Sequence, residues 1–236
     1  MTMIESFAGR YLDGRIECEA DPAAIAQSVY ANGVALLTGV FDTEPLARLR
    51  QTVFEWSLGM EPQVDSNVSF HRIDHLPQKS KTPHIFHAYN LYLREGAIEP
   101  RLDEAFRPYF TAMKGLQNAL TENDADFTAD ADGRFLRPQV LQYPSGGGFF
   151  DRHDHPFLPQ KIGLIVGLSQ QGKDFTSGST WFEFNGERIS IENKHNMGDI
   201  ALFKYDLPHG ITAIDDDEKL DWRSPQGRWT MVLPYY

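Results

Sequence analysis

The hydrophobic and polar positions of the chain follow a helical period in its first part and a strand pattern in its second. In residues 1–133, apolar side chains recur every three or four positions, which is typical of helices that bury one face. This spacing, with capping residues at Asp21-Pro22 and at Asp42 or Thr43, predicts helices over 22–32, from 43 onward, and over 100–121. A short apolar run predicts one buried strand at 34–37.

From about Arg134 onward, short apolar runs alternate with Gly, Pro, Asn and Asp, which is the pattern of strands joined by turns. Asn185-Gly186 is a strong hairpin signal. The predicted strands span 137–143, 149–155, 162–169, 179–184, 187–191, 199–205, 209–214 and 228–235. Eight short strands of this kind favour a double-sheet jelly roll. The expected fold is therefore α+β, with the main strands in 134–236, the mainly helical residues 1–133 packed outside, and a single domain over 1–236.

Composition and charge narrow the classes of function. The chain has 236 residues and a net charge of -11, so its surface repels phosphate backbones and anionic membranes. No apolar run approaches the roughly 18 residues that cross a bilayer, and the first residues lack the basic and apolar regions of a signal peptide. The one cysteine, Cys18, allows no internal disulfide. We expect a cytoplasmic protein whose partner is neither nucleic acid nor membrane.

Candidate metal ligands are concentrated in Asp151-Arg152-His153-Asp154-His155. On a regular strand His153 and His155 share one face and Asp154 points away. Asp151 shares the histidine face, but it lies about 13 Å from His155, too far for both to bind one ion. A third histidine, His209, follows the predicted strand that begins at Gly198-Asp199. Because a late strand of a jelly roll can lie beside an early one, the three histidines can meet and hold a metal.

The remaining histidines offer weaker signals. Four of them lie in the irregular stretch 57–95, with no metal-ligand spacing, and are expected in loops or on the surface. The alternative is that this stretch forms a pocket wall, with His71, Arg72, His75, His84, Phe86, His87 and Tyr89 as the candidates. His195 lies in a polar stretch and is interpreted as a loop histidine. Gln142 and Gln160 are further polar residues that are able to face a pocket.

The order of these motifs resembles that of the non-haem Fe(II), 2-oxoglutarate-dependent dioxygenases. The resemblance rests on Tyr143…Gly146-Gly147-Gly148…His153-x-His155, on Gly198-Asp199…Phe203…His209-Gly210, on Arg228-x-Thr230, and on the segment from Gly33 to Phe41 followed by a helix. It implies a double-stranded β-helix core, the jelly roll of this family, and covers about two thirds of the chain.

The resemblance implies an oxidoreductase that uses Fe(II), O2 and 2-oxoglutarate to hydroxylate or otherwise oxidise a small molecule. By position, the metal ligands are His153, His155 and His209. Arg228 binds the far carboxylate of 2-oxoglutarate, assisted by the hydroxyl of Thr230; an arginine fork suits a carboxylate bidentately. For Arg228 the alternative is a surface salt bridge to one of the acids at 215–217.

One position departs from the family pattern, because His155 stands where the usual His-x-Asp motif has its carboxylate. Three neutral imidazoles leave the site one positive charge richer. Three explanations stay open: His155 is itself a ligand, a bulge brings in Asp151 or Asp154, or the protein is a cupin-like three-histidine dioxygenase without 2-oxoglutarate. A non-catalytic jelly-roll protein that binds a metal or ligand is the remaining alternative.

Overall fold

The structure is a computed structural model that describes residues 4–60, 63–64, 71–76, 82–93 and 98–235. For residues 63–64 and 71–76 it describes the backbone only. The elements in chain order are β1 (Glu5–Leu12), β2 (Arg15–Cys18), α1 (Pro22–Asn32), β3 (Val34–Thr38), α2 (Thr43–Leu58), β4 (Gln63–Val64), β5 (His71–Leu76), β6 (His84–Asn90), α3 (Pro100–Thr121), β7 (Gln139–Pro144), β8 (Gly148–His153), β9 (Ile162–Gly167), β10 (Thr180–Phe184), β11 (Glu187–Ser190), β12 (Ile200–Lys204), β13 (His209–Ile214) and β14 (Gly227–Val232).

The predicted helices form where local chemistry starts and stops them. At the start of α1, the Asp21 side chain accepts a hydrogen bond of 2.8 Å from the backbone N–H of Ala23, and Pro22 occupies the first turn. The helix ends at Gly33, whose φ of 82° few other residues adopt. The backbone N–H of Gly33 donates to the carbonyl of Val29, so the end of the helix is capped as well as its start.

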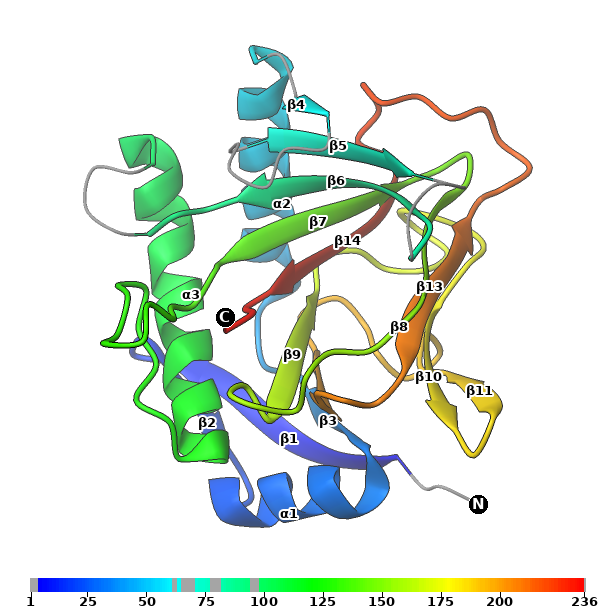
Figure 1. Cartoon of the computed structure of the whole chain (residues 1–236). Helices are drawn as coiled ribbons and strands as arrows, with labels where there is room; N and C mark the ends of the chain where they lie inside the picture. Colours follow the sequence, from blue (N-terminus) through cyan, green and yellow to red (C-terminus); the bar gives the residue numbers. More distant parts are fainter. Residues whose placement is uncertain (1–3, 61–62, 65–70, 77–81, 94–97, 236) are drawn as a thin grey trace.

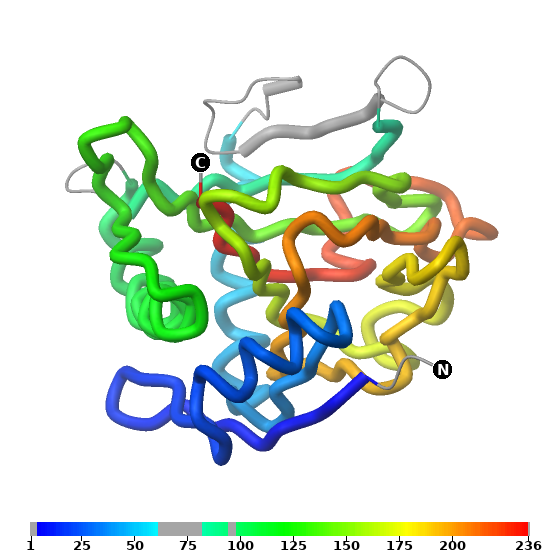
Figure 2. The backbone as a smooth tube through the Cα atoms, turned by 60° about the horizontal axis from the view of Figure 1, so that its bottom comes forward, coloured from blue at the N-terminus to red at the C-terminus, as the bar shows by residue number. Residues whose placement is uncertain are grey.

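The strands join into one mostly antiparallel sheet that curls into a jelly roll (Figure 1). Its order is β11-β10-β13-β8-β6-β7-β14-β9-β12-β3-β1-β2, with β5 pairing with β6 and β4 with β5. Both views place α3 and the β10–β11 hairpin, which forms one edge of the sheet, at opposite ends of the molecule (Figures 1 and 2). The predicted α+β jelly roll is confirmed, and β13, late in the sequence, pairs with the early strand β8.

Alternation along each strand separates a helix-facing side of the sheet from an inner side. On β14, Trp229 and Met231 belong to a core cluster shared with side chains of all three helices. The neighbouring residues Arg228 and Thr230 point to the other side and line an internal cavity. The main core therefore lies between the sheet and the helices, and the curl of the sheet encloses the cavity.

Two parts of the prediction need correction. The stretch 57–95, expected to be irregular, contains β4, β5 and β6. On β6 the last five residues, from Phe86 to Asn90, are all buried, so no alternation of apolar and polar residues marked it as a strand. The strand predicted over 149–155 ends at His153, and His155 lies beyond it. The other predicted strands are present within three residues of their expected bounds.

In the part of the chain that the structure describes, no helix combines the length and the apolar character that crossing a membrane requires.

Candidate metal centre

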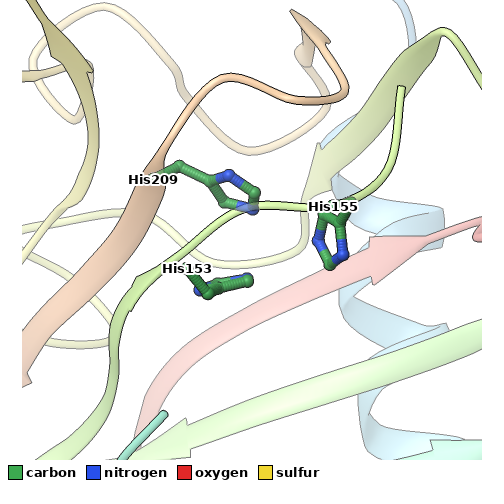
Figure 3. Close-up of side chains that lie close together, drawn as sticks. All are labelled: His153, His155 and His209. Atoms are coloured by element: carbon green, nitrogen blue, oxygen red, sulfur yellow. The ribbon is translucent and has the colours of Figure 1, made fainter. Parts of the chain in front are cut away.

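Three histidines converge at the open end of the β8–β13 pair (Figure 3). His153 ends β8 and lies directly opposite His209, the first residue of β13. His155 follows two positions after His153, and one ligand nitrogen of each ring lies within 4.8 Å of the others. Among the described residues, this is the one group of three or more potential ligands that the geometry allows to hold a metal ion.

Backbone carbonyls set the orientation of two of the three rings. Nδ1 of His153 lies 2.9 Å from the carbonyl oxygen of Asp151, and Nδ1 of His209 lies 2.8 Å from that of Leu207. A carbonyl only accepts, so each Nδ1 carries the proton and donates it. In both rings Nε2 then keeps its lone pair, which is the arrangement that a metal-binding imidazole needs.

His155 reaches the group by a route other than the predicted alternation along a strand. β8 has ended at His153, and residues 154–156 beyond it are irregular. The ring of His155 stacks on Tyr205 with centroids 4.4 Å apart and an interplanar angle of 15°. Asp151 and Asp154 are both exposed, and neither joins the histidine group. The structure therefore brings His155, and neither aspartate, to the third position.

All three histidines are held neutral by their surroundings. Burial lowers the pKa of His155 to about 4, and the nearby His153 adds to the shift. Burial also lowers the pKa of His153, and it lowers that of His209 well below its usual value, with His153 contributing to the latter. Neutral imidazoles at neutral pH are ready to bind iron, copper, zinc or nickel without first losing a proton.

The histidines line a cavity of about 550 Å³ inside the curled sheet. Its lining includes Arg228 and Arg137 as well as aromatic and aliphatic side chains. Within the described part of the chain, no aspartate or glutamate contributes to the lining. An acidic protein thus encloses a cavity whose charged lining residues are arginines, which favours anionic ligands.

Arg228 lies inside this cavity rather than at the surface. It is 1% exposed, and its Nε donates to the two carboxylate oxygens of Glu192 at 3.1 and 3.2 Å. The surface salt bridge to the acids at 215–217, considered as an alternative, is therefore wrong. Nη1 of Arg228 is buried and has no hydrogen-bond partner. Thr230, two residues along β14, faces the same cavity.

Near Arg228 lie two residues that were not singled out from the sequence, Thr180 and Glu192, and one, His195, that was given no role there. Thr180 lines the cavity, and its buried Oγ1 has no hydrogen-bond partner. Glu192 is 7% exposed and holds Arg228. His195, interpreted as a loop histidine, lies in a loop but is buried, and burial together with Arg228 lowers its pKa. Nothing in their sequence context distinguishes these residues, because their role depends on contacts with a distant strand.

The stretch suggested as a pocket wall contributes in part. His84 and Phe86 line the cavity. His87 and Tyr89 do not line it; Tyr89 belongs to the helix-facing core and stacks on Trp229 with centroids 5.7 Å apart. Of the two glutamines, Gln160 lines the cavity and Gln142 does not. The side chains of His71, Arg72 and His75 lie outside the described residues.

No protein-family model matches the sequence. No curated protein matches it either. Solved structures do: a Pseudomonas putida prolyl-4-hydroxylase aligns with a TM-score of 0.58 at 14% identity, covering 91% of this chain and 97% of that one. A Trichoplax adhaerens prolyl hydroxylase in complex with a peptide fragment of hypoxia-inducible factor gives 0.59 at 13% identity, covering 91% and 88%.

A Burkholderia pseudomallei oxidoreductase of the 2OG-Fe(II) oxygenase family aligns over 99% of this chain and 95% of its own, with a TM-score of 0.56 at 12% identity. These three alignments extend over nearly the whole of both partners. The chain therefore has the fold of the Fe(II), 2-oxoglutarate oxygenases, as the resemblance of its motifs implied. At identities this low, the structural likeness shows the fold alone, and activity has to be argued from the site.

Proposed function

We propose that this chain is a single-domain non-haem iron oxygenase that uses 2-oxoglutarate and O2 to hydroxylate, or otherwise oxidise, a small molecule. The observation that carries the proposal is one cavity with two kinds of receptor. Three neutral histidines with converging nitrogens lie in its wall, and Arg228 lines the same cavity with an unpartnered Nη1. A 2-oxo dicarboxylate has a chelating end for the first receptor and a carboxylate for the second.

The residues present fit both groups. Imidazole nitrogens are suitable ligands for iron, and two of the three rings have the tautomer that leaves Nε2 free. The basic lining of the cavity matches the charge of a dicarboxylate. When bound, iron would supply the activation of O2, with 2-oxoglutarate and O2 converted to succinate, CO2 and one oxygen atom that is transferred to the substrate.

The chain's own residues would bind and orient the reactants and keep water out. His153, His155 and His209 would hold the metal, and Arg228, with Thr230 beside it, would hold the far carboxylate. Asn90 and Gln139 also line the cavity and lie opposite each other, with Gln139 donating to Asn90 over 2.6 Å. Val232, paired with Gln139, is four residues along β14 from Arg228, or about 13 Å. This separation leaves room for a substrate beside the co-substrate.

The test is the release of succinate from 2-oxoglutarate by the protein supplied with Fe(II) and ascorbate, across a panel of amino acids, peptides and secondary metabolites. A companion measurement is the thermal stabilisation of Mn(II)-loaded protein by 2-oxoglutarate. We expect Arg228→Ala to remove this stabilisation and leave the metal content intact. Absence of both succinate release and stabilisation in the wild type would overturn the proposal.

Two further variants make the assignment of Arg228 decisive. Arg188→Ala is the matched control, because Arg188 stacks on Trp181 and does not line the cavity. It should keep the stabilisation by 2-oxoglutarate. Arg228→Met combined with Glu192→Gln replaces the buried pair by neutral side chains of similar size, an exchange that often leaves stability unchanged. If this double variant still binds 2-oxoglutarate as the wild type does, the assignment of Arg228 is wrong.

A second candidate function is a three-histidine iron dioxygenase that does not use 2-oxoglutarate. The observation in its favour is that, among the described residues, no carboxylate joins the histidine group. Such an enzyme would consume O2 with its substrate and release no succinate. The same assay separates the two functions, since only the first depends on 2-oxoglutarate. A protein that takes up metal and shows neither reaction would be the non-catalytic binding protein.

A further inference from the structure

Glu192 occupies an unusual position for a carboxylate, because it is buried behind the cavity and bonded to two elements that line it. Its Oε2 accepts from the backbone N–H of Thr180 at 2.9 Å and from Nε of Arg228 at 3.1 Å. The backbone N–H of Ile191 donates to the carbonyl of Thr180 at 3.0 Å. Thr180 and Arg228 come from strands that are not neighbours in the sheet, β10 and β14, and Glu192 ties them together.

The hydrogen bonds to Glu192 leave one donor on each partner unused. Arg228 donates to Glu192 through Nε, and its Nη1 has no hydrogen-bond partner. Thr180 donates to Glu192 through its backbone N–H, and its hydroxyl has no hydrogen-bond partner. Both residues line the cavity and are almost fully buried, at 1% and 0% exposed. Two buried donors without acceptors, held in a basic cavity, suit a ligand carboxylate.

The place of this pair relative to the histidines fits a dicarboxylate. Thr180 lies opposite Ile211, and Phe182 lies opposite His209. Thr180 is therefore two residues along β10 from the position opposite His209, or about 7 Å. Three carbon atoms separate the carboxylate carbons of 2-oxoglutarate at its two ends. A 2-oxo acid chelated at the histidine level would extend its far end toward Arg228 and Thr180.

Glu192 also sets the charge of the cavity. A divalent metal on three neutral histidines contributes two positive charges, and Arg228 contributes a third. The carboxylate of Glu192 offsets the charge of Arg228, so the metal and the arginine receptor together keep two positive charges, the number that a dicarboxylate neutralises; Arg137, elsewhere in the lining, adds one more. The histidine group contains no carboxylate, and Glu192 supplies a negative charge beside Arg228 instead.

We propose that Glu192 is a positioning residue that fixes Nη1 of Arg228 and the hydroxyl of Thr180 as a receptor for the distal carboxylate of the co-substrate. The inference rests on the proposed function and adds to it two residues outside the Arg228-x-Thr230 motif, Glu192 and Thr180. It assigns to Glu192 no contact with the ligand: the residue acts through Arg228 and Thr180.

The test measures the preference for a dicarboxylate over a matched monocarboxylate. Wild type and Glu192→Gln are loaded with Mn(II), and calorimetry gives their dissociation constants for 2-oxoglutarate and for 2-oxobutyrate, which lacks the distal carboxylate. We expect Glu192→Gln to lower the preference for 2-oxoglutarate by about tenfold, because the arginine loses its charge-assisted anchor. Binding of 2-oxobutyrate and the Mn(II) content should stay at wild-type values.

A purely structural role for Glu192 would not change this ratio, since a loss of stability affects both ligands alike. Glu183→Gln is the matched control: Glu183 also pairs with an arginine, Arg152 at 2.8 Å, but does not line the cavity. The control should keep the wild-type preference. A preference that is unchanged or increased in Glu192→Gln overturns the inference, as does an equal loss in the control.

Two further variants cover the remaining outcomes. Thr180→Val should lower the preference by about threefold, since it removes one neutral donor; an unchanged value would remove Thr180 from the receptor. If Glu192→Gln does not fold, Glu192→Asp takes its place, since it keeps the charge and shortens the side chain. It should still lower the preference for 2-oxoglutarate by about threefold or more, which corresponds to the weakening of one hydrogen bond. A wild-type value there overturns the inference. A wild type that binds no 2-oxoglutarate contradicts the proposed function itself, and the inference with it.

Discussion

The histidine group and Arg228 line the same cavity, and the fold holds them by opposite means. The histidines are neutral, and backbone carbonyls next to them in sequence orient two of the three rings. Arg228 is charged, and a side chain 36 residues away orients it. Local carbonyls can preset a lone pair at little electrostatic cost, whereas a buried guanidinium needs a counter-charge from elsewhere in the fold. The two sites should therefore respond differently to mutation and to pH.

The largest expected effect lies at the arginine. Arg228→Ala leaves Glu192 buried without its partner, and breaking a buried ion pair on one side costs about 3–5 kcal/mol. Urea unfolding of the metal-free protein measures this change. Arg10→Ala is the control, since Arg10 pairs with Glu17 at the surface, where such pairs contribute about 1 kcal/mol or less. Equal losses in the two variants would mean that burial adds nothing to the Arg228 pair.

The next effect concerns the metal. His209→Ala should weaken metal binding more than about 100-fold, since even the loss of an outer hydrogen-bond partner of a ligand costs about 10–100-fold. Metal content after dialysis against a weak chelator checks this. His84→Ala provides the comparison, because His84 lines the cavity but does not belong to the histidine group. Retention of metal by His209→Ala would exclude His209 as a ligand.

The third effect is a pH dependence that belongs to the histidines and not to the arginine. The folded-state pKa of His155 is lowered to about 4, so between about 6.5 and 4 the unfolded chain binds a proton that the folded chain does not. Metal-free protein should therefore lose stability as the pH falls through this window. His155→Gln should reduce the loss, measured as the urea midpoint against pH. An unchanged slope in this variant would contradict the assignment.

The smallest effect tests the ring contact of His155. Tyr205 stacks on this imidazole at 4.4 Å, and an aromatic pair contributes about 0.5–1.5 kcal/mol. Tyr205→Leu should therefore weaken metal binding by roughly two- to tenfold, as competition with a chromogenic chelator would show. His195→Gln is the control, because this histidine bonds to the carbonyl of Asp199 and does not belong to the histidine group; it should leave the metal affinity unchanged. A loss in Tyr205→Leu as large as that in His209→Ala would show that Tyr205 does more than support the ring.

The residue pattern was a good guide wherever local chemistry determines structure. Helix caps such as Asp21-Pro22 and the turn at Asn185-Gly186 act over a few residues, so helices and strands appear at their predicted places. The pairing of β8 with β13, which follows from a jelly roll, places His153 opposite His209. Strand β6 was missed because most of its side chains are buried on both faces, which removes the alternation that reveals a strand.

The sequence by itself determined the eight strands from Gln139 to Val232, the three helices and the identity of the three histidines as candidate ligands. Only the tertiary structure decided that His155 reaches the group from beyond the end of β8, that Asp151 and Asp154 stay exposed, and that Arg228 pairs with Glu192. The physical reason is range. The spacing of hydrophobic residues, helix caps and turn preferences depend on near neighbours in the sequence. The surroundings of a buried charge come from strands that meet only after the sheet has closed.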